Sequence, residues 1–390
     1  MKVRGGVPCQ PAEGQRLRLG FASNEPRSRY LVSELRELAE EVVEIDFDHI
    51  DAATKYSAAL LSWRRPRSDW WEAYQMHPLV QRRRRVILQR ALAAVDAELD
   101  ALVMWGSWFH PFRTRPASGL TYFNYIDQSY SLTPSFGEPR ASPRGRTQAH
   151  RLQAETYRDS QGILCMSQWA RAQTLAAHTV PAEKVHVVGW GPCGVDLSSE
   201  EIPADSREPL ILHVSNSFYR KGVDYLLETA RLVAEAEPSA RFLVIGDDCE
   251  KMPVRDTANV TFVGPVVDRE TLAAYLRRAS LFFLPHRFDR SPHVLVEAMS
   301  AGLPIVTSSQ GGSVELVAGS RAGYCVAIGD VPGYARAIMA LLRDPAARSG
   351  MGAHGRAAVR RTYNWRAVAA TILRVAAQAI KRAGQRATPR

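Results

Sequence analysis

Two loops in the second half of the chain combine charged residues with the expected start of a helix. The first, Ser215–Gly222, follows an apolar run of strand length and contains Asn216, Arg220 and Lys221. A helix start presents unpaired N–H groups and the positive end of the helix dipole. Together with a nearby lysine, these groups can bind a phosphate or diphosphate. Because a Lys-Gly pair before a helix is common, a purely structural role is the alternative.

The second loop carries two acids, Asp289 and Glu297. Ser291 is expected to cap a helix whose first residue is Pro292, which puts Asp289 in the loop and Glu297 in the second turn. One carboxylate can then reach a sugar while the other meets hydroxyl groups deeper in a cleft. Alternatively, both are ordinary surface acids. The N–H groups of the first turn are predicted to be free for phosphate; they belong to His293, Val294 and Leu295.

Weaker candidates follow other strand-like runs. Gly246 and Val266 end two of them in the second half, and a Gly311-Gly312 pair follows a third. Glycine there lets the backbone approach a base or ribose closely, but each could equally form a tight turn. In the first half, Asp127 is a candidate acceptor or sugar contact, or else a turn cap, and His110 is a second such candidate.

The elements that must position these residues alternate along the chain. Short apolar, β-branched runs alternate with helical patterns of ten or more residues, which predicts α/β folding with parallel sheets and right-handed crossovers. Ligands bind beyond the carboxyl ends of such strands, where the strand order reverses. The expected strands are 17–21, 42–47, 102–105, 121–126, 162–166, 185–188, 210–214, 242–245, 260–263, 281–284, 304–308 and 324–327.

Length and composition indicate a globular protein of two domains. The chain has 390 residues, 46% hydrophobic and 23% charged, and is too long for one compact core. Its apolar runs are far shorter than the roughly 20 residues of a spanning helix. Residues 1–15 lack the apolar core of a secretory signal and are expected to be a loose extension. Five scattered cysteines indicate neither a disulfide framework nor a zinc site, so we expect a cytoplasmic protein.

The net charge of +10 is concentrated in two arginine-rich places. One interpretation is a solvated helix face; the other is peripheral contact with anionic lipid or a lipid-linked acceptor on the inner face of a membrane. The two places are Arg64, Arg65 and Arg67 beside Trp63, Trp70 and Trp71, and the run Arg82–Arg85 in an expected basic helix over 79–99.

The order of these pieces resembles family-four retaining glycosyltransferases of the GT-B type. The resemblance covers about half the chain, and Asp289–Ser308 is its strongest part. It implies two Rossmann-like domains facing each other across a cleft. Residues 1–195 would bind the acceptor, 196–365 the nucleotide-sugar donor, and a helix and tail over 366–390 would return toward the N-terminal domain. The other matching stretches are Lys221–Leu227, Phe242–Gly246, Val260–Gly264 and Gly194–Asp196.

The resemblance also implies roles for individual residues. The family pattern of two glutamates with seven residues between them corresponds to Asp289, near the donor sugar, and Glu297, on the ribose. Lys221 matches the diphosphate lysine. Asn216 stands where the family usually has an arginine, and Arg220 is a possible substitute.

The implied reaction transfers a sugar, with retention, from a UDP- or GDP-type donor to a hydroxyl of a polysaccharide, a lipid-linked or a small-molecule acceptor. Lys221 and helix N–H groups would stabilise the leaving diphosphate, so no metal or cofactor is expected. Asp289 would stabilise an oxocarbenium-like sugar. The alternative is a catalytically inactive nucleotide-sugar-binding protein. An oxidoreductase is disfavoured because no GxGxxG follows an early strand, and no nucleic-acid partner is expected. Base, acceptor and oligomeric state stay open.

Overall fold

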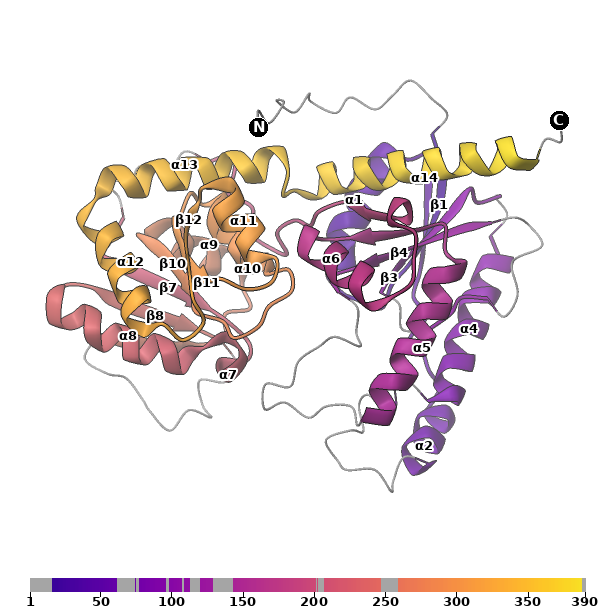
Figure 1. Cartoon of the computed structure of the whole chain (residues 1–390), viewed down its shortest axis with the longest axis horizontal. Helices are drawn as coiled ribbons and strands as arrows, with labels where there is room; N and C mark the ends of the chain where they lie inside the picture. Colours follow the sequence, from indigo (N-terminus) through magenta and orange to yellow (C-terminus); the bar gives the residue numbers. More distant parts are fainter. Residues whose placement is uncertain are drawn as a thin grey trace. The chain divides into compact units, whose positions relative to one another are not determined.

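The chain folds into two compact units, each built on its own sheet (Figure 1). The computed structural model describes residues 16–61, 74, 77–95, 98–106, 109–112, 120–128, 143–200, 202, 207–246 and 259–387. The first unit comprises Met1–Met166, Ala170–Gly189 and Trp365–Arg390, and the second Ser167–Trp169 and Trp190–Asn364. Residues 1–15 and the Trp63–Trp71 region, for which we made predictions, lie outside the described residues.

The first unit has a six-stranded parallel sheet in the order β2-β1-β3-β4-β5-β6. The order reverses between β1 and β3. The strands are β1 (Arg18–Ala22), β2 (Glu41–Ile45), β3 (Ala101–Trp105), β4 (Thr121–Ile126), β5 (Gly162–Cys165) and β6 (Val185–Val187). The helices are α1 (Ser28–Leu38), α2 (Ala52–Leu61), α4 (Pro78–Ala93), α5 (Pro143–Asp159), α6 (Gln168–Ala177) and the C-terminal α14 (Trp365–Ala387).

The C-terminal helix α14 packs against α1 within this first unit. Arg366 at its start lies 3.4 Å from Glu34 of α1, and the Trp365 ring lies 6.0 Å from the ring of Trp105. The apolar residues Val368, Ile372 and others of the same face are buried, as expected for an amphipathic helix on a core. The last stretch of the chain therefore completes the first unit.

The basic helix α4 does not present a solvated arginine face. Arg84 is fully buried with its guanidinium 2.6 Å from Asp48, and Arg83 lies 3.0 Å from Asp51. Arg85 donates to the carbonyl of His110, and within Arg82–Arg85 only Arg82 is exposed. The interpretation of this run as a solvated face is wrong for Arg84, which is buried; Arg83 and Arg85 are half-buried and bond to loops of the first unit. The helix also ends at Ala93, short of the predicted Leu99.

The second unit has a six-stranded parallel sheet in the order β12-β11-β10-β7-β8-β9. From β7 the chain adds β8 and β9 on one side, then returns to add β10, β11 and β12 on the other. The order therefore reverses between β7 and β10. The strands are β7 (Leu210–Val214), β8 (Arg241–Ile245), β9 (Val260–Gly264), β10 (Leu281–Leu284), β11 (Ile305–Ser308) and β12 (Gly323–Val326).

Helices cover both faces of this second sheet (Figure 1). They are α7 (Phe218–Lys221), α8 (Val223–Ala236), α9 (Arg269–Arg278), α10 (His293–Ser300), α11 (Ser313–Ser320), α12 (Val331–Arg343) and α13 (Pro345–Arg361). The core under α8 and α12 joins Leu226 and Ile338 of the helices to Ile211, Phe283 and other alternate strand residues. Each such side chain, when fully buried, contributes about 1.5–3 kcal/mol.

The unit boundary falls at Gly189, six residues before the position predicted at 195. Residues 190–195 lie in the second unit because their peptide groups form hydrogen bonds with its side chains. Cys193 N–H donates to Glu297, the Gly194 carbonyl accepts from Arg269, and the Gly191 carbonyl lies 2.7 Å from His293 Nδ1.

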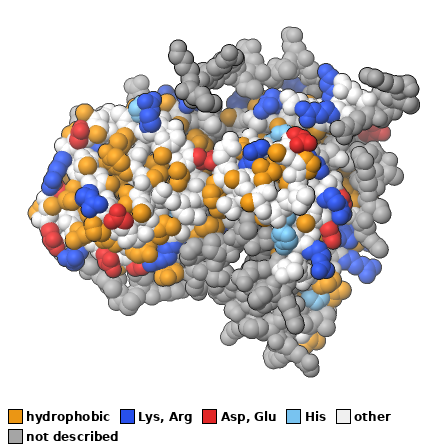
Figure 2. Space-filling model, viewed as in Figure 1, with side chains coloured by type: hydrophobic (Ala, Val, Ile, Leu, Met, Phe, Trp, Pro, Cys, Tyr) orange, Lys and Arg blue, Asp and Glu red, His pale blue; other side chains and the backbone are white. Residues whose placement is uncertain are grey.

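Charged side chains do not gather in one patch on the face of the molecule that Figure 2 shows. On the face shown in Figure 2, lysine and arginine side chains are scattered among acidic and apolar ones. In the part of the chain that the structure describes, no helix is both long enough and apolar enough to cross a bilayer.

Candidate functional site

The candidate site lies where the strand order of the second unit reverses. β7 and β10 are hydrogen-bonded neighbours, so the loops that follow them emerge at the same sheet edge. Gly222, between α7 and α8, has φ +74°, and a Cβ there would lie 1.9 Å from the carbonyl oxygen of Pro285. The two loops therefore touch through their backbones, as the prediction of one site between two helix starts required.

Lys221 and Asp289 are ion-paired across these loops. Both side chains are nearly buried, with 9% and 13% of their surfaces exposed. Burial opposes ionisation of Asp289, yet the charges of Lys221 and Arg220 and the hydrogen bond from Lys221 hold its pKa well below the ordinary value. The site thus holds a carboxylate and an ammonium group in direct contact, at the position where ligands bind in such sheets.

Arg220 lies in the same loop and bonds to its neighbours. Its guanidinium lies 3.5 Å from Asn216 Oδ1 and 3.4 Å from the carbonyl oxygen of Phe288. The exposed Asn216 and the half-buried Arg220 are therefore adjacent; their contact with the diphosphate end of a donor stays a prediction.

Arg287 is a residue of this site that the sequence analysis missed. Its guanidinium lies between the rings of Tyr219 and Tyr225, 4.0 Å from each centroid, and pairs with Asp224. Its N–H donates to the Arg220 carbonyl. This stacking holds the loop after β10 against α7 and α8. Nothing in local spacing predicts it, because the partners lie 62 to 68 positions away in the chain.

The loop after β11 supports Asp289 from the other side. Gln310 Oε1 accepts the Asp289 N–H at 3.2 Å. Gly311 has φ +64°, and a Cβ there would lie 2.0 Å from the Asp289 carbonyl oxygen. The Gly311-Gly312 pair was predicted as a nucleotide contact or a turn. The pair forms a turn whose close approach orients Asp289, and its contact with a nucleotide stays a prediction. Gln310 was not predicted.

The start of α10 differs from the prediction. The helix begins at His293 with Pro292 as its N-cap, so Pro292 is not the first helical residue. Ser291 does not cap it: its Oγ is buried and has no hydrogen-bond partner among the described residues. The Leu295 N–H donates to the Pro292 carbonyl, so it is not available to a ligand as predicted. The Val294 N–H has no acceptor in the described part of the chain.

Glu297 lies on α10 beneath the segment that joins the two sheets. Its Oε1 accepts from the N–H groups of Cys193 and Val195 at 3.1 and 3.5 Å. Burial raises its pKa to about 7, against the hydrogen bonds from Val195 and Cys193 and the charge of Arg269. Sequence reasoning assigned Glu297 to the ribose. The structure adds a second role, because it holds the Gly194–Asp196 segment in place.

Two buried histidines lie under the site. His213 joins β7 to β10 with Nδ1 2.9 Å from the Phe283 carbonyl and Nε2 2.9 Å from Ser215 Oγ. His286 lies 2.7 Å from Ser313 Oγ. Burial lowers both pKa values to about 4, so both rings are neutral at pH 7. They order the strand ends without adding charge.

The remaining predicted donor contacts lie on the β8–β9 side. A Cβ at Gly246 would lie 1.7 Å from the Ser215 carbonyl oxygen. This residue is therefore glycine because of packing against the loop after β7. Val266 is half-buried after β9. No group of three or more metal-type ligands occurs among the residues described here.

The two first-unit candidates lie apart from each other. Asp127 is half-buried at the carboxyl end of β4. His110 lies 3.1 Å from Asp159, the last residue of α5, and 3.3 Å from the hydroxyl of Tyr122 at the start of β4. His110 is therefore placed toward the amino ends of the strands, where ligands of such sheets do not usually bind.

Comparison with known proteins gives a family match within the second unit. Residues 208–344, which include Lys221, Asp289 and Glu297, match the family described as "Glycosyl transferases group 1". The phosphatidyl-myo-inositol mannosyltransferase of Mycobacterium leprae is 35% identical over 162 residues, 40% of this chain and 42% of its own length. That of Mycolicibacterium smegmatis is 31% identical over 196 residues, 47% and 50% of the two lengths. The chain spans about half the length of these curated relatives.

Solved structures match almost the whole chain. Sucrose-phosphate synthase from Thermosynechococcus elongatus aligns with 94% of this chain and 100% of its own, with a TM-score of 0.68 and 18% identity. HepE of Anabaena in complex with UDP aligns with 93% and 100%, with a TM-score of 0.63 and 16% identity. At sequence identities this low, the structural similarity is evidence for the fold alone. The predicted α/β class of GT-B type is confirmed, with two parallel six-stranded sheets.

Proposed function

We propose that this protein is a retaining glycosyltransferase that moves a sugar from a nucleoside-diphosphate donor to an acceptor hydroxyl. The contact between Lys221 and Asp289 at the strand reversal of a group 1 glycosyl transferase segment carries the proposal. Two relatives are phosphatidyl-myo-inositol mannosyltransferases, and the structure of HepE was solved in complex with UDP. Both observations support a nucleotide-sugar donor. The donor base, the sugar and the acceptor are left open.

The reaction needs stabilisation of a departing diphosphate and of a cationic sugar. Lys221 can pass from Asp289 to the diphosphate, helped by Arg220 and the Val294 N–H at the start of α10. Asp289, which its pairing with Lys221 holds as a carboxylate before the donor binds, then faces the sugar and stabilises oxocarbenium character. Glu297 accepts from ribose hydroxyls. These groups perform the reaction without a metal ion.

The first test is a binding screen. Nucleoside diphosphates and nucleotide sugars are titrated against the full chain while its thermal unfolding is followed, because a specific ligand raises Tm by mass action. We expect one base to stabilise the wild type. Lys221→Met should abolish that shift, whereas Arg231→Met, an exposed cation on α8, should not. A shift that survives Lys221→Met contradicts the donor site.

The second test measures turnover. Release of nucleoside diphosphate from the stabilising donor is followed with and without acceptors, and the anomeric configuration of the product is read by NMR. We expect Asp289→Asn to lower kcat about 10²-fold or more with a small change in donor affinity. Glu235→Gln, an exposed acid of α8, is the matched control. Inversion at the anomeric carbon contradicts the retaining mechanism. Donor binding with no turnover against any acceptor favours the inactive binding protein instead.

A further inference from the structure

Gln310 connects the loop after β11 to the loop that carries Asp289. Its Oε1 accepts the Asp289 N–H at 3.2 Å. Because β10 and β11 are hydrogen-bonded parallel neighbours, both loops leave the sheet at its carboxyl edge, where ligands of such sheets bind. Gln310 therefore lies at the proposed donor site, although no sequence motif singled it out.

The main chain on both sides of Gln310 is fixed by hydrogen bonds. The Ser309 N–H donates to the Val326 carbonyl of β12 at 2.7 Å, and the Gly312 N–H donates to the Arg290 carbonyl at 3.0 Å. Gln310 is thus a half-buried side chain on a short, tightly held turn. The position of its amide group is set by this turn.

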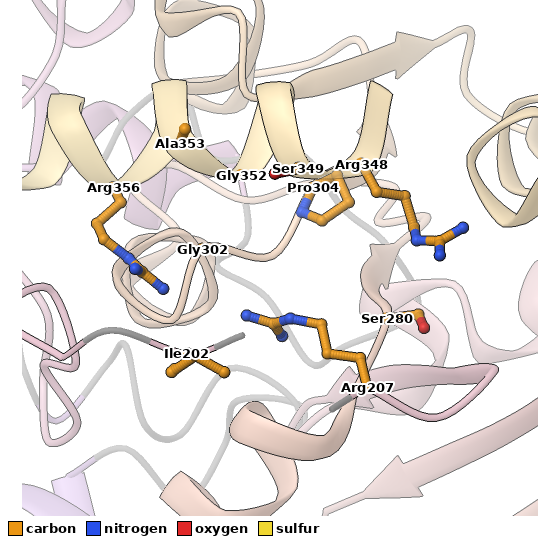
Figure 3. Close-up of a pocket in the computed structure, with 10 residues that line it drawn as sticks. All are labelled: Ile202, Arg207, Ser280, Gly302, Pro304, Arg348, Ser349, Gly352, Ala353 and Arg356. Carbon is orange, nitrogen blue, oxygen red and sulfur yellow. The ribbon is translucent and has the colours of Figure 1, made fainter. Parts of the chain in front are cut away.

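The helix that follows Asp289 is held at its far end. Arg207 and Arg356 both donate to the carbonyl oxygen of Ala301, directly after α10, at 2.6 and 2.9 Å. Figure 3 shows the two guanidinium groups directed toward each other below α13. Cationic groups at a helix C-terminus also suit the negative end of its dipole. Since β10 precedes the Asp289 loop and the anchored α10 follows it, both ends of this loop are fixed.

The amide group of Gln310 has a second polar atom, which the fold does not use. A glutamine amide has an oxygen that accepts hydrogen bonds and an NH₂ group that donates them. Because a peptide N–H can only donate, the oxygen must face Asp289, and this fixes the orientation of the amide. The NH₂ group donates to no acceptor in the part of the chain that the structure describes.

Asp289 and Gln310 present opposite hydrogen-bonding groups beside each other. The Asp289 carboxylate, which is paired with Lys221, only accepts hydrogen bonds, whereas the remaining NH₂ group of Gln310 only donates them. A hydroxyl group does both, so one hydroxyl can bond to the two residues together. A phosphate oxygen cannot, because it is an acceptor whose negative charge Asp289 repels. The combination therefore favours a neutral group that carries hydroxyls.

Other side chains close to Asp289 are less suited to donate to such a group. Ser291 Oγ is buried, so a ligand cannot reach it without a rearrangement, and Pro292 has no N–H. The His286 ring is fully buried and bonds to Ser313. Gln310, in contrast, keeps part of its side chain open to solvent.

We propose that Gln310 binds a hydroxyl group of the donor sugar through its NH₂ group, while its oxygen holds the Asp289 peptide. This inference rests on the proposed function, since it requires a nucleotide sugar at Asp289. Gln310 then helps to determine which sugar is accepted, because it contacts the sugar rather than the diphosphate that all such donors share.

The test compares nucleotide sugars with free nucleoside diphosphates by calorimetric titration of the full chain. The probes are UDP and UDP-glucose, and GDP and GDP-mannose. We expect Gln310→Met, which removes both polar atoms of the amide, to weaken binding of the nucleotide sugar about threefold to tenfold. Affinity for the free diphosphate should not change. Ser309→Ala, an exposed neighbour in the same turn, should alter neither affinity. Equal losses for nucleotide sugar and free diphosphate in Gln310→Met overturn the proposal, because they indicate a general disturbance of the site.

Deoxy analogues of the bound donor identify the hydroxyl group that Gln310 contacts. Removing that hydroxyl should weaken binding to the wild type but should have little effect in Gln310→Met, where its partner is already absent. If every deoxy analogue loses as much affinity in the variant as in the wild type, Gln310 contacts no hydroxyl and the proposal is wrong.

A second variant guards against poor folding of Gln310→Met. Gln310→Glu keeps an acceptor for the Asp289 N–H but has no donor at neutral pH, so it should also bind the nucleotide sugar more weakly. Wild-type affinity in Gln310→Glu overturns the proposal. If the wild type binds no nucleotide sugar, the proposed function and this inference both fail. Wild-type binding that neither substitution weakens overturns this inference alone.

Discussion

Lys221 and Asp289 lie 68 residues apart in the chain and form an ion pair at the strand reversal of the second sheet. Lys221 is proposed to bind the diphosphate of the donor and Asp289 its sugar, and the charge of each residue depends on the other. Lys221 keeps Asp289 ionised, and Asp289 compensates a nearly buried ammonium group. The first prediction follows from this dependence.

Lys221→Met is expected to destabilise the protein by about 3–5 kcal/mol at pH 7, because it leaves Asp289 as an uncompensated buried charge. The double variant Lys221→Met/Asp289→Asn should recover part of that loss. The measurement is a double-mutant cycle of apparent unfolding free energies in urea. Additive effects of the two substitutions would show that the pair does not couple.

Glu297→Gln is expected to stabilise the protein at pH 8 and to have little effect at pH 4.5. Burial raises the Glu297 pKa from 4.5 to about 7 in the folded state. Between these values the folded state binds more protons than the unfolded state, so wild-type stability falls as pH rises through that window. A glutamine keeps an acceptor for the Cys193 N–H and removes this loss of stability, which is on the order of 3 kcal/mol.

The measurement is Tm against pH for both proteins, with the exposed Glu235→Gln as control. The curves should diverge between about pH 4.5 and 7. Parallel curves would mean that Glu297 is not a buried carboxyl. Nucleotide affinity should fall in the same variant, because glutamine is a weaker acceptor for ribose hydroxyls than a carboxylate.

Gly222→Ala is expected to disrupt the site by steric clash. Gly222 and Gly264 both have positive φ, at +74° and +87°, but a Cβ at Gly264 meets nothing within 4 Å. Gly264→Ala should therefore cost only the conformational penalty of about 1–2 kcal/mol. Gly222→Ala adds overlap with Pro285, so it should lower Tm further and weaken nucleotide binding. Equal Tm losses in the two variants would exclude the clash.

Arg287→Lys is expected to loosen the loop after β10. A lysine keeps the charge near Asp224 but cannot stack its planar group between Tyr219 and Tyr225. We expect a loss of about 1–2 kcal/mol in apparent stability and a lower kcat, because the loop carries Asp289. Arg231→Lys, in an exposed pair on α8, should change neither quantity.

Most of the strand pattern was predictable from sequence. Short apolar, β-branched runs depend on local residue order, so β7 to β12 begin within one residue of their predicted starts. Helix ends were less predictable. Ser291 and Pro292 are residue types typical of a helix N-cap and a first helical residue. Nevertheless α10 begins at His293, because the close packing of the loop after β11 sets the path of the chain here.

The sequence by itself determined the alternation of strands and helices and the loops that carry Lys221, Asp289 and Glu297. These features depend on neighbours within a few positions. Only the tertiary structure decided that Lys221 meets Asp289, that Glu297 holds the Gly194–Asp196 segment, and that Arg287 stacks between Tyr219 and Tyr225. The physical reason is that such contacts join residues tens of positions apart, and their partners are chosen by strand order and packing of the whole sheet rather than by local propensity.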